Sequence, residues 1–535
     1  MAEEEEAVVV VAEVDDKFLN FHSKIIFIRV MKKIFILILF TIATNSIFSQ
    51  NEFDAVKYSQ TDIVGSARYM GMAGAFGAVG GDMSGIEINP AGLGVFRRFE
   101  LSLGFGAVGT QNKSTLENES SIVHRTHIPF NNFGFVLAFN SNKESGILNN
   151  NFSFTYNKLK NFNYNTTVSG SNLGSSLSDY MADMTNGLLK TDLDATNPYN
   201  NAEIGFLSIL GYKAGLIEPT ESGSNTWQSS MPNETVNSLY NARESGYVNE
   251  WKFAYSMNVN NVFYWGLSVG ITDLFYKKET FYKEEIGSLG DFSIDNSFRT
   301  EGIGANFGLG IIFRPIDQIR LGAAVKTPTI YSSSAEDYGL EDSQRTSISS
   351  SKTTLEEYCS SNSYYQFISP WKYNFSAAFI LGHRGLISLD YELMDYAHMR
   401  LIEDYGGTSG FSTENNNIKK LKMTHSLRAG LEIHIGAGVF ARLGYAFVTS
   451  PFNDVDLHRN DAINTVRTDT EYFREKWTNY YSGGLGWRNS HWFVDLAYLL
   501  KHTTADFYAY NWVNLPAANL LYLHHNVAVS AGYKF

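Results

Sequence analysis

The sequence predicts an all-β protein, a 14-stranded antiparallel transmembrane β-barrel with an N-terminal hatch (plug) inside the lumen. Three observations predict this fold: the composition, an alternation of apolar and polar residues with a period of two, and an alternation of long with short connections. Aromatic residues make up 14% of the 535 residues and charged residues 18%, below the roughly 25% charged residues of typical globular proteins. Much of the surface is therefore expected to face something other than water.

Charge and cysteine content exclude several classes of protein. The chain carries 42 basic and 55 acidic residues, a formal net charge of −13, which argues against nucleic acid as a partner. The single cysteine, Cys359, excludes a disulfide framework and a multi-cysteine metal site. The 12 histidines show no recognisable zinc-binding or catalytic spacing. We therefore expect no metal, no cofactor and no enzymatic activity.

The first 49 residues are predicted to lie outside the fold. Residues 31–49 place a basic pair, a short apolar run and a small polar segment in the order of a secretory signal peptide, with cleavage near Ser49. Residues 1–30 are predicted to be an upstream extension that is not native, with an amphipathic anchor as the alternative. Beyond the signal there is no stretch of 18 apolar residues, so a membrane-spanning chain of this kind has to be a barrel.

The alternation with a period of two recurs along the rest of the chain. In residues 99–106 the odd positions are Phe, Leu, Leu and Phe, and the even positions are Glu, Ser, Gly and Gly. In later segments the face opposite the aromatic residues carries charges of both signs, at Arg320, Asp390, Glu392, Arg428, Glu432, Arg442, Arg488 and Asp495. Charges fit a wet lumen, and an apolar face with aromatic girdles fits lipid. A secreted soluble β protein is the alternative, because a sandwich also alternates.

The lengths of the connections favour the barrel over the sandwich. Strands are predicted at roughly 98–108, 128–142, 146–168, 248–261, 262–283, 298–314, 318–330, 368–382, 385–401, 420–435, 438–452, 477–488, 490–504 and 521–535. Long connections are predicted near 109–127, 169–247, 284–297, 331–367, 402–419, 453–476 and 505–520, and they alternate with short turns. Long loops at one end and short turns at the other are typical of an outer-membrane barrel. We therefore assign residues 98–535 to the barrel, with 169–247 as its largest loop.

Residues 50–97 lie outside the strand pattern and form the predicted hatch. This segment is dense in glycine and alanine, particularly over 71–81. A phosphate-binding loop is not expected here, because no Gly-Lys-Ser/Thr follows and no strand–helix unit surrounds the segment. Small residues instead fit backbone that packs closely against other backbone or against a barrel wall.

The hatch also carries a resemblance to a known family. Its Ala67-Arg68, the run 70–76 (MGMAGAF), Asp82 and Asn89-Pro90-Ala91-Gly92-Leu93 follow a signal peptide in the order seen in long-chain fatty acid transporters of the FadL type. The segment is equally similar to the hatch of their aromatic-hydrocarbon relatives of the TodX type. Residues 309–315 and the terminal Gly532-Tyr533-Lys534-Phe535 resemble the barrel of that family, which also has fourteen strands.

The resemblance implies passive uptake of hydrophobic molecules, such as fatty acids or aromatic hydrocarbons, across the outer membrane of a Gram-negative-type envelope. In that family, extracellular loops capture the ligand, the hatch closes its pocket, and the ligand leaves sideways through the barrel wall. The expected ligand-binding residues are Phe76, Met83, Ile86 and Leu93 in the hatch and Phe206, Leu207, Leu210 and Leu216 in the largest loop, which also carries a predicted helix around 177–189. The expected gate residues are Asp82, Asn89, Pro90 and Ala91. The alternative for the apolar loop residues is that they form the loop's own packed core.

A fatty acid would also need a partner for its carboxylate, because a charge in an apolar pocket is costly when unpaired. Arg320, Arg428 and Arg442 face inward by parity and are the candidates, with ordinary ion pairs inside the lumen as the alternative. The other expected partners are outer-membrane lipid and, through the terminal Phe535, the barrel-assembly machinery. Two other functions stay open, a general diffusion porin and a structural or host-contact barrel.

Overall fold

The computed structural model describes residues 50–535, except 233–234, 333–339, 355, 404–406, 409, 454–464 and 513–514. The predicted upstream extension and signal peptide lie outside the described residues. No helix among the described residues is both long and apolar enough to cross a membrane.

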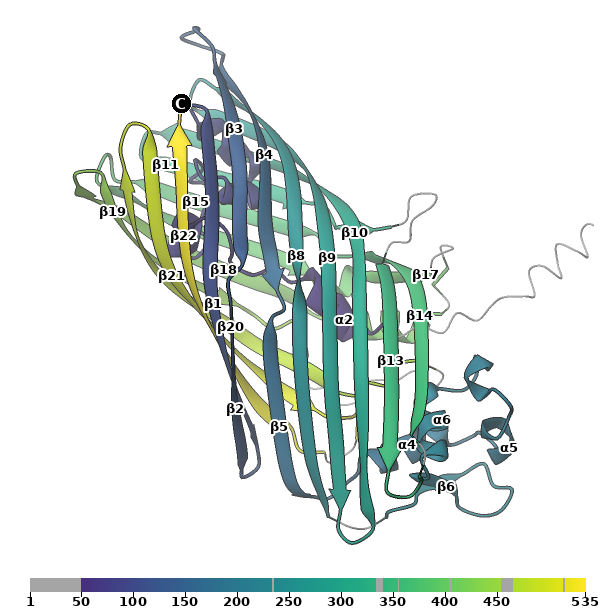
Figure 1. Ribbon diagram of the computed structural model, residues 1–535. Helices are drawn as coiled ribbons and strands as arrows, with labels where there is room; N and C mark the ends of the chain where they lie inside the picture. The colour runs from purple at the N-terminus through teal and green to yellow at the C-terminus, as the bar shows by residue number, and fades with distance from the viewer. Residues whose placement is uncertain are drawn as a thin grey trace, which may run out of the picture. The chain divides into compact units, whose positions relative to one another are not determined.

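The described strands form one closed antiparallel barrel, which confirms the predicted fold class (Figure 1). Its segments are β1 (Glu100–Leu116), β2 (Glu119–His127), β3 (Phe130–Asn140), β4 (Ile147–Asn161), β5 (Tyr164–Leu173), β8 (Val236–Val259), β9 (Phe263–Ile286), β10 (Gly290–Ile316), β11 (Ile319–Lys326), β12 (Ile330–Tyr331), β13 (Leu340–Ser350), β14 (Glu357–Ile368), β15 (Lys372–Ile380), β16 (Gly385–Asp395), β17 (Arg400–Glu403), β18 (Met423–Gly436), β19 (Val439–Val448), β20 (Tyr472–Arg488), β21 (Trp492–Tyr508) and β22 (Ala518–Lys534). Over the described residues these 20 segments make fourteen strands. Five of these strands are interrupted and therefore consist of more than one segment: β2–β3, β4–β5, β11–β13, β14–β15 and β16–β17.

The barrel closes where the first strand meets the last. β1 pairs with β22 without interruption from Glu100↔Lys534 to Thr115↔Asn519. Side chains of β1 alternate between buried and exposed, and its outward Leu101, Leu103 and Phe105 are 37–50% exposed. An apolar outer belt over a polar interior is the arrangement that lipid requires of a barrel.

Several predicted strand ends were wrong, because the strands continue beyond the apolar belt. β8, β9 and β10 contain 24, 24 and 27 residues, whereas about 9–11 residues suffice to cross a bilayer. Most of the predicted loops 109–127 and 284–297 is strand. Past the belt the outward face becomes polar, as at Lys277, Glu279 and Lys283, while the inward face stays buried. The apolar outward row therefore ends although the hydrogen-bonded ladder continues.

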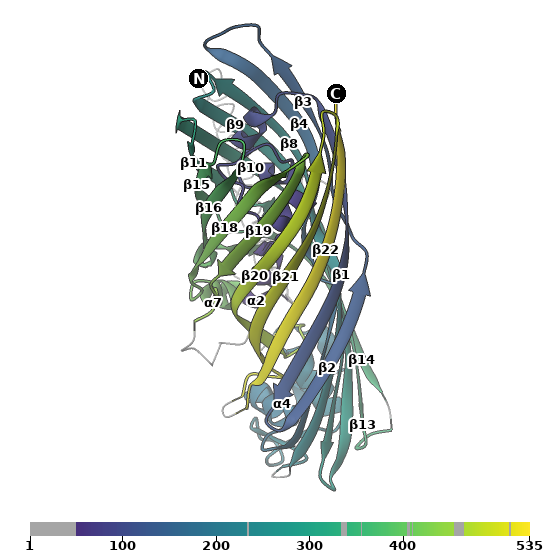
Figure 2. The same ribbon diagram turned by 90° about the vertical axis from the view of Figure 1, so that its left-hand side faces the viewer.

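The segment 50–97 fills the lumen as four short helices (Figure 2). They are α2 (Glu52–Ser59), α3 (Ala67–Gly71), η1 (Ser84–Glu87) and η2 (Pro90–Val95). An Asn51 capping box starts α2: the Asn51 side chain accepts hydrogen bonds from the backbone N–H of Phe53 and Asp54. The helix α3 packs against β19–β22, and η2 packs against β8–β10. The hatch therefore contacts two separate parts of the barrel wall from inside the lumen.

The largest loop folds into a cap that packs on the barrel at the long-loop end. It contains α4 (Leu177–Thr185), α5 (Lys190–Leu193), η3 (Pro198–Asn200), α6 (Phe206–Lys213) and a two-stranded sheet of β6 (Ile217–Pro219) and β7 (Trp227–Ser229). The helix predicted around 177–189 corresponds to α4. Among the described residues two further helices are η4 (Tyr396–His398), which interrupts the strand between β16 and β17, and α7 (Ser412–Ile418), which lies in the loop before β18.

Close contact between hatch and wall makes a glycine test informative. A Cβ atom added at Gly266 of β9 would lie 2.5 Å from the carbonyl group of Pro90, whereas one added at Gly109 of β1 would meet no atom within 4 Å. We expect Gly266→Val to displace the hatch at about 1–3 kcal/mol, the usual cost of overpacking, while the barrel stays folded. The measurement is the rate of trypsin cleavage within residues 50–97, alongside heat-modified electrophoretic mobility of the barrel. Gly109→Val is the matched control, and equal cleavage rates in the two variants would contradict the contact.

Candidate functional site

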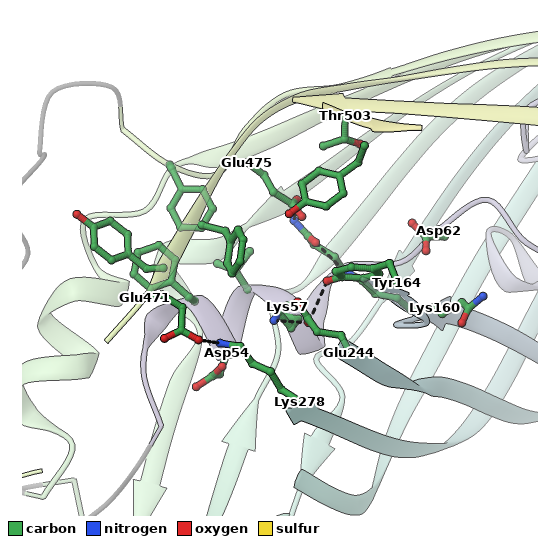
Figure 3. Close-up of a pocket in the computed structure, with 18 of the residues that line it drawn as sticks. Asp54, Lys57, Asp62, Lys160, Tyr164, Glu244, Lys278, Glu471, Glu475 and Thr503 are labelled. Atoms are coloured by element: carbon green, nitrogen blue, oxygen red, sulfur yellow. Dashed lines mark hydrogen bonds and ion pairs between the residues drawn. The ribbon is translucent and has the colours of Figure 1, made fainter. Parts of the chain in front are cut away.

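A cavity lies in the lumen between α2 and the barrel wall (Figure 3). It is lined by Phe53, Asp54, Val56, Lys57, Gln60, Asp62, Lys160, Asn161, Tyr164, Glu244, Lys278, Phe452, Arg467, Glu471, Tyr472, Phe473, Glu475, Lys501, Thr503, Tyr522 and His524. Its volume is about 70 Å³, room for about five water molecules when each needs roughly 10–15 Å³. The cavity is therefore closed down around α2 in this state.

One part of the lining is apolar. Phe53 of α2 stacks on Phe452 with ring centroids 5.2 Å apart, and it lies at the same centroid distance from Tyr472. Phe473 lies beside them in β20 and also lines the cavity. A hydrocarbon chain could pack against these rings, which lie at the N-terminal end of α2.

The opposite part of the lining is densely charged, and most of its cations have carboxylate partners. Lys57 Nζ lies 2.8 Å from Glu244 Oε2 and donates a second hydrogen bond to Tyr276. Lys278 Nζ lies 2.6 Å from Glu471 Oε1, and Arg467 pairs with Asp469. These pairs are buried, so each charge depends on its partner.

Lys501 is also neutralised, by Asp62 in the chain between α2 and α3. Its Nζ lies 2.7 Å from Asp62 Oδ1. Burial alone would raise the pKa of Asp62, but the positive charges of Lys501 and Lys160 outweigh it and hold that pKa at about 2. The Asp62 carboxylate is therefore ionised at neutral pH, which keeps Lys501 paired.

Lys160 differs from the other cations of the cavity. Its Nζ donates to the amide oxygen of Gln60 at 2.6 Å, and no carboxylate of the described residues lies within ion-pair distance of it. The Gln60 amide in turn donates to Glu475 at 2.8 Å. Lys160 is buried, with 6% of its surface exposed. A buried lysine that meets a neutral amide can accept an anionic ligand in place of that amide.

The barrel wall beside this cavity lacks its backbone pairing. β3 and β4 pair from Asn140↔Asn149 to Asn132↔Asn157. Beyond that point, among the described residues, β2 has no backbone pairing with β4 or β5, although β4 and β5 stay paired with β8. Pro129 separates β2 from β3 and cannot donate a ladder hydrogen bond. The second and third strands therefore part at this height.

Side chains bridge the two parted strands instead. His127 of β2 contacts Asn161 of β4, and Arg125 donates to the side-chain oxygen of Asn163 at 3.2 Å. Farther along, Ser121 and Ser169 lie 3.0 Å apart. A second, smaller cavity runs from the pocket residues Asp62, Asn161, Lys501 and His524 to Pro129, Asn131 and Lys158. The gap is thus plugged by side chains and adjoins the pocket.

Buried ion pairs hold the other end of the hatch to the wall. Arg68 of α3 makes a two-pronged contact with Glu432 of β18, with both N···O distances 2.8 Å. Glu432 also accepts from Arg442 at 2.6 Å, and Arg442 lies 2.7 Å from Asp495. Removing one partner of such a buried pair typically costs about 3–5 kcal/mol, so this end of the hatch is firmly held, as α2 is by the pair of Lys57 with Glu244.

The predicted gate residues lie at turns and contacts of the hatch. Asp82 accepts hydrogen bonds from the Ser66 hydroxyl at 2.8 and 2.9 Å. Asn89 donates to the backbone oxygen of Gly77 at 2.7 Å and to that of Ile311 in β10 at 3.1 Å. Pro90 and Ala91 begin η2. These contacts join the hatch to itself and to the wall, and a gating role remains a prediction.

The predicted ligand-binding residues lie away from the cavity around α2. Phe76 packs in a core with Tyr69 and Met70, and Met83, Ile86 and Leu93 pack with Phe96 against the wall. Phe206, Leu207, Leu210 and Leu216 are buried in a core that joins α4 and α6 of the cap to inward side chains of the barrel strands. Their contact with a ligand stays a prediction.

The predicted arginines are engaged with other groups. Arg320 donates to the backbone oxygen of Val79, Arg428 lies 2.9 Å from Glu392, and Arg442 belongs to the ion pairs that hold the hatch. Sequence parity identified lumen-facing cations but not Lys160, the cation of the cavity that has no carboxylate partner among the described residues. Parity also fails at Lys160, because the register of β4 against β8 shifts between Lys158 and Lys160. The polar side of α2 and its capping residues were the available signal for the pocket.

Comparison with known proteins confirms the resemblance in fold. No protein-family model matches the chain, and no curated protein matches it. Among solved structures, a FadL homologue of Pseudomonas aeruginosa is similar with a TM-score of 0.53 and 10% identity, over 89% of this chain and 100% of that one. The P. putida toluene transporter TodX matches with a TM-score of 0.48 and 12% identity, over 89% and 99%. The Ralstonia pickettii toluene transporter TbuX matches with a TM-score of 0.46 and 12% identity, over 88% and 99%. The chain thus has the barrel-and-hatch fold of the FadL homologue.

Proposed function

We propose that this protein is an outer-membrane channel for passive uptake of hydrophobic molecules that carry a carboxylate, such as long-chain fatty acids. The observation that carries the proposal is the cavity under α2, where an apolar wall faces a buried lysine with no carboxylate partner among the described residues. Its position beside a gap in the barrel wall provides a way out. The fold shared with a FadL homologue supports a transport role over an enzymatic one.

The proposed route has three steps. The ligand enters from the long-loop end, which we assign to the outside of the cell, and its chain lies against Phe53, Phe452 and Tyr472. Its carboxylate replaces the Gln60 amide on Lys160. The ligand then passes between β2–β3 and β4–β5 into the outer leaflet once the side-chain contacts across the gap separate.

Apolar burial provides most of the affinity in this scheme. Burying eight methylene groups at about 0.8 kcal/mol each contributes about 6 kcal/mol before ordering costs. The carboxylate adds direction, because it has to meet Lys160 to remain charged. The pocket has to widen from its present volume to the several hundred Å³ typical of ligand pockets, and a shift of α2 is the simplest way to widen it.

The two other candidate functions are less well supported. A general diffusion porin needs an open lumen, whereas residues 50–97 fill this one. A host-contact barrel is favoured by the folded cap and its buried core, but that role gives no purpose to the pocket or the gap. Recognition of Phe535 by the barrel-assembly machinery remains part of the proposal; that side chain is 68% exposed.

The first prediction concerns Lys160. We expect Lys160→Gln to weaken oleate binding about tenfold or more, because a hydrogen bond to a charged group contributes on the order of 1.5–3 kcal/mol. Binding of oleate methyl ester should change little, since the ester carries no charge. The measurement is radiolabelled ligand binding to the purified barrel in a non-lipid detergent. Lys283→Gln, at a strand tip far from the cavity lining, is the control; a parallel loss of ester binding in Lys160→Gln would argue against a carboxylate site.

The second prediction concerns the gap. In a Cys359→Ser background, His127→Cys and Asn161→Cys should be joined by a reducible bis-thiosulfonate cross-linker, which bridges the two parted strands. We expect the linked barrel to bind oleate but to lose uptake into cells, and a reductant should restore uptake. The control places the same linker on Ser293→Cys and Ser349→Cys, whose hydroxyls lie 3.0 Å apart on an intact ladder. Normal uptake by the linked gap variant would rule out this exit.

A further inference from the structure

We propose that the outer face of the barrel at the long-loop end binds the saccharide headgroup of an outer-leaflet glycolipid. The proposal rests on the proposed outer-membrane location, and it assigns a second binding site that is separate from the pocket inside the lumen. The site is a groove of about 1230 Å³, far larger than the cavity under α2.

The groove has a floor of four adjacent strand segments and two walls. Its floor is a row of outward residues in direct register: Arg243 of β8, Glu279 of β9, Ser297 of β10 and Arg345 of β13. One wall is the β1–β2 hairpin, which lies over the outer face of β5, since Ser114 donates to the backbone oxygen of Thr167 at 2.5 Å. The other wall is the turn at η3, with Tyr199 in the lining.

The lining has the chemistry of a saccharide site. Two exposed arginines, an exposed Glu279 and an exposed Asp295 offer planar charged groups that can bind sugar hydroxyls in pairs. Phe281 and Tyr358 supply aromatic surface in the neighbouring row, and Tyr358 is 65% exposed. An apolar ligand would contact only the aromatic side chains, and a bare phosphate would contact only the arginines. A saccharide can contact both.

The distance of the groove from the apolar belt favours a sugar that is attached to a lipid. The aromatic row nearest the apolar belt contains Tyr247 and Phe275, with ring centroids 5.9 Å apart. Arg243 stands four residues farther along β8, or about 13 Å along the strand and about 10 Å along the barrel axis at a tilt of roughly 35–45°. The outward face at this height borders the layer that lipid headgroups occupy, because it points sideways and not into the lumen.

A pair of cations lies between that aromatic row and the groove. Lys277 and Arg299 are cross-strand partners on the outer face, and like charges in direct register are unfavourable unless anions compensate them. Glu279 and Glu301 do so in part, at 2.5 Å from Lys277 and Arg299 respectively. The two cations stand where the acidic group that joins a sugar headgroup to its lipid would lie.

The groove also stands directly above the mouth of the gap. Lys158 faces outward there, donating to Asn249 at 3.2 Å with its ammonium 5.1 Å from the Tyr247 ring centroid. The acyl chains of a glycolipid held in the groove would therefore border the exit. In this arrangement the glycolipid is a structural neighbour of the exit and not the transported ligand.

Binding of purified glycolipids to the full barrel in micelles tests the proposal. The probes are lipopolysaccharide that carries core sugars, lipid A without them, and the core oligosaccharide released from lipid A. We expect the first to bind best, and Arg243→Ser with Arg345→Ser to weaken its binding about tenfold or more. The matched control is Lys143→Ser with Arg384→Ser, which removes the same charge at the short-turn end. Native mass spectrometry gives the bound fraction, and heat-modified mobility confirms folding.

Each alternative outcome overturns a defined part of the proposal. Equal binding of lipid A would reduce the site to a phosphate contact, and equal binding of the free oligosaccharide would assign it to soluble saccharides. If the groove variant and the control variant bound lipopolysaccharide equally well, the groove would not be a glycolipid site. Oleate binding, measured on the same samples, distinguishes the two proposals. If the wild-type barrel does not bind oleate, the proposed channel function is wrong. If it binds oleate but no glycolipid, only the proposed glycolipid site is wrong.

Discussion

Satisfaction of backbone hydrogen bonds in lipid is the constraint on which the rest of the structure depends. An unpaired N–H or C=O in the hydrocarbon region costs several kcal/mol, so a sheet that crosses a membrane has to close on itself. The uninterrupted ladder between β1 and β22 completes that closure. Closure then creates a lumen, and a lumen of fourteen strands is too wide for wall side chains alone to fill. The hatch fills it, and the pocket is the space that the hatch leaves.

The gap between the second and third strands is the exception to closure, and the chain compensates for it locally. A bulge between Lys158 and Lys160 reverses parity, so one lysine faces outward and the other faces the pocket. In a regular strand, residues two apart share a face. The interruption that opens the wall thus also delivers a buried cation to the cavity beside it. The β1–β2 hairpin covers the exposed strand edge from outside.

The features visible in the sequence are those imposed by lipid. Outward residues such as Leu101 and Phe105 have to be apolar, and so the period of two and the strand count could be predicted. Strand ends could not, because beyond the belt the outward face becomes polar while the ladder continues, so the apolar outward pattern no longer marks the strand. The pocket was also hidden: α2 carries no unusual composition, and the ionic role of Lys160 depends on a bulge that no local pattern reveals. Parity correctly placed Arg428 and Arg442 in the lumen, but only geometry shows that both already have partners.

Both ends of the hatch are attached to the wall through buried ion pairs, and they differ in how they meet the pocket. Its α3 end is held by the buried contact of Arg68 with Glu432, so moving that end would expose or strand charges. Its α2 end is tied near the pocket by Gln60, a neutral amide between Lys160 and Glu475. A carboxylate that takes the place of this amide gains a charge-assisted hydrogen bond and releases the residue that ends α2. A ligand that binds Lys160 therefore acts on the end of the hatch that lies next to the pocket and the parted strands, and a shift of α2 there also has to keep or exchange the buried pair of Lys57 with Glu244.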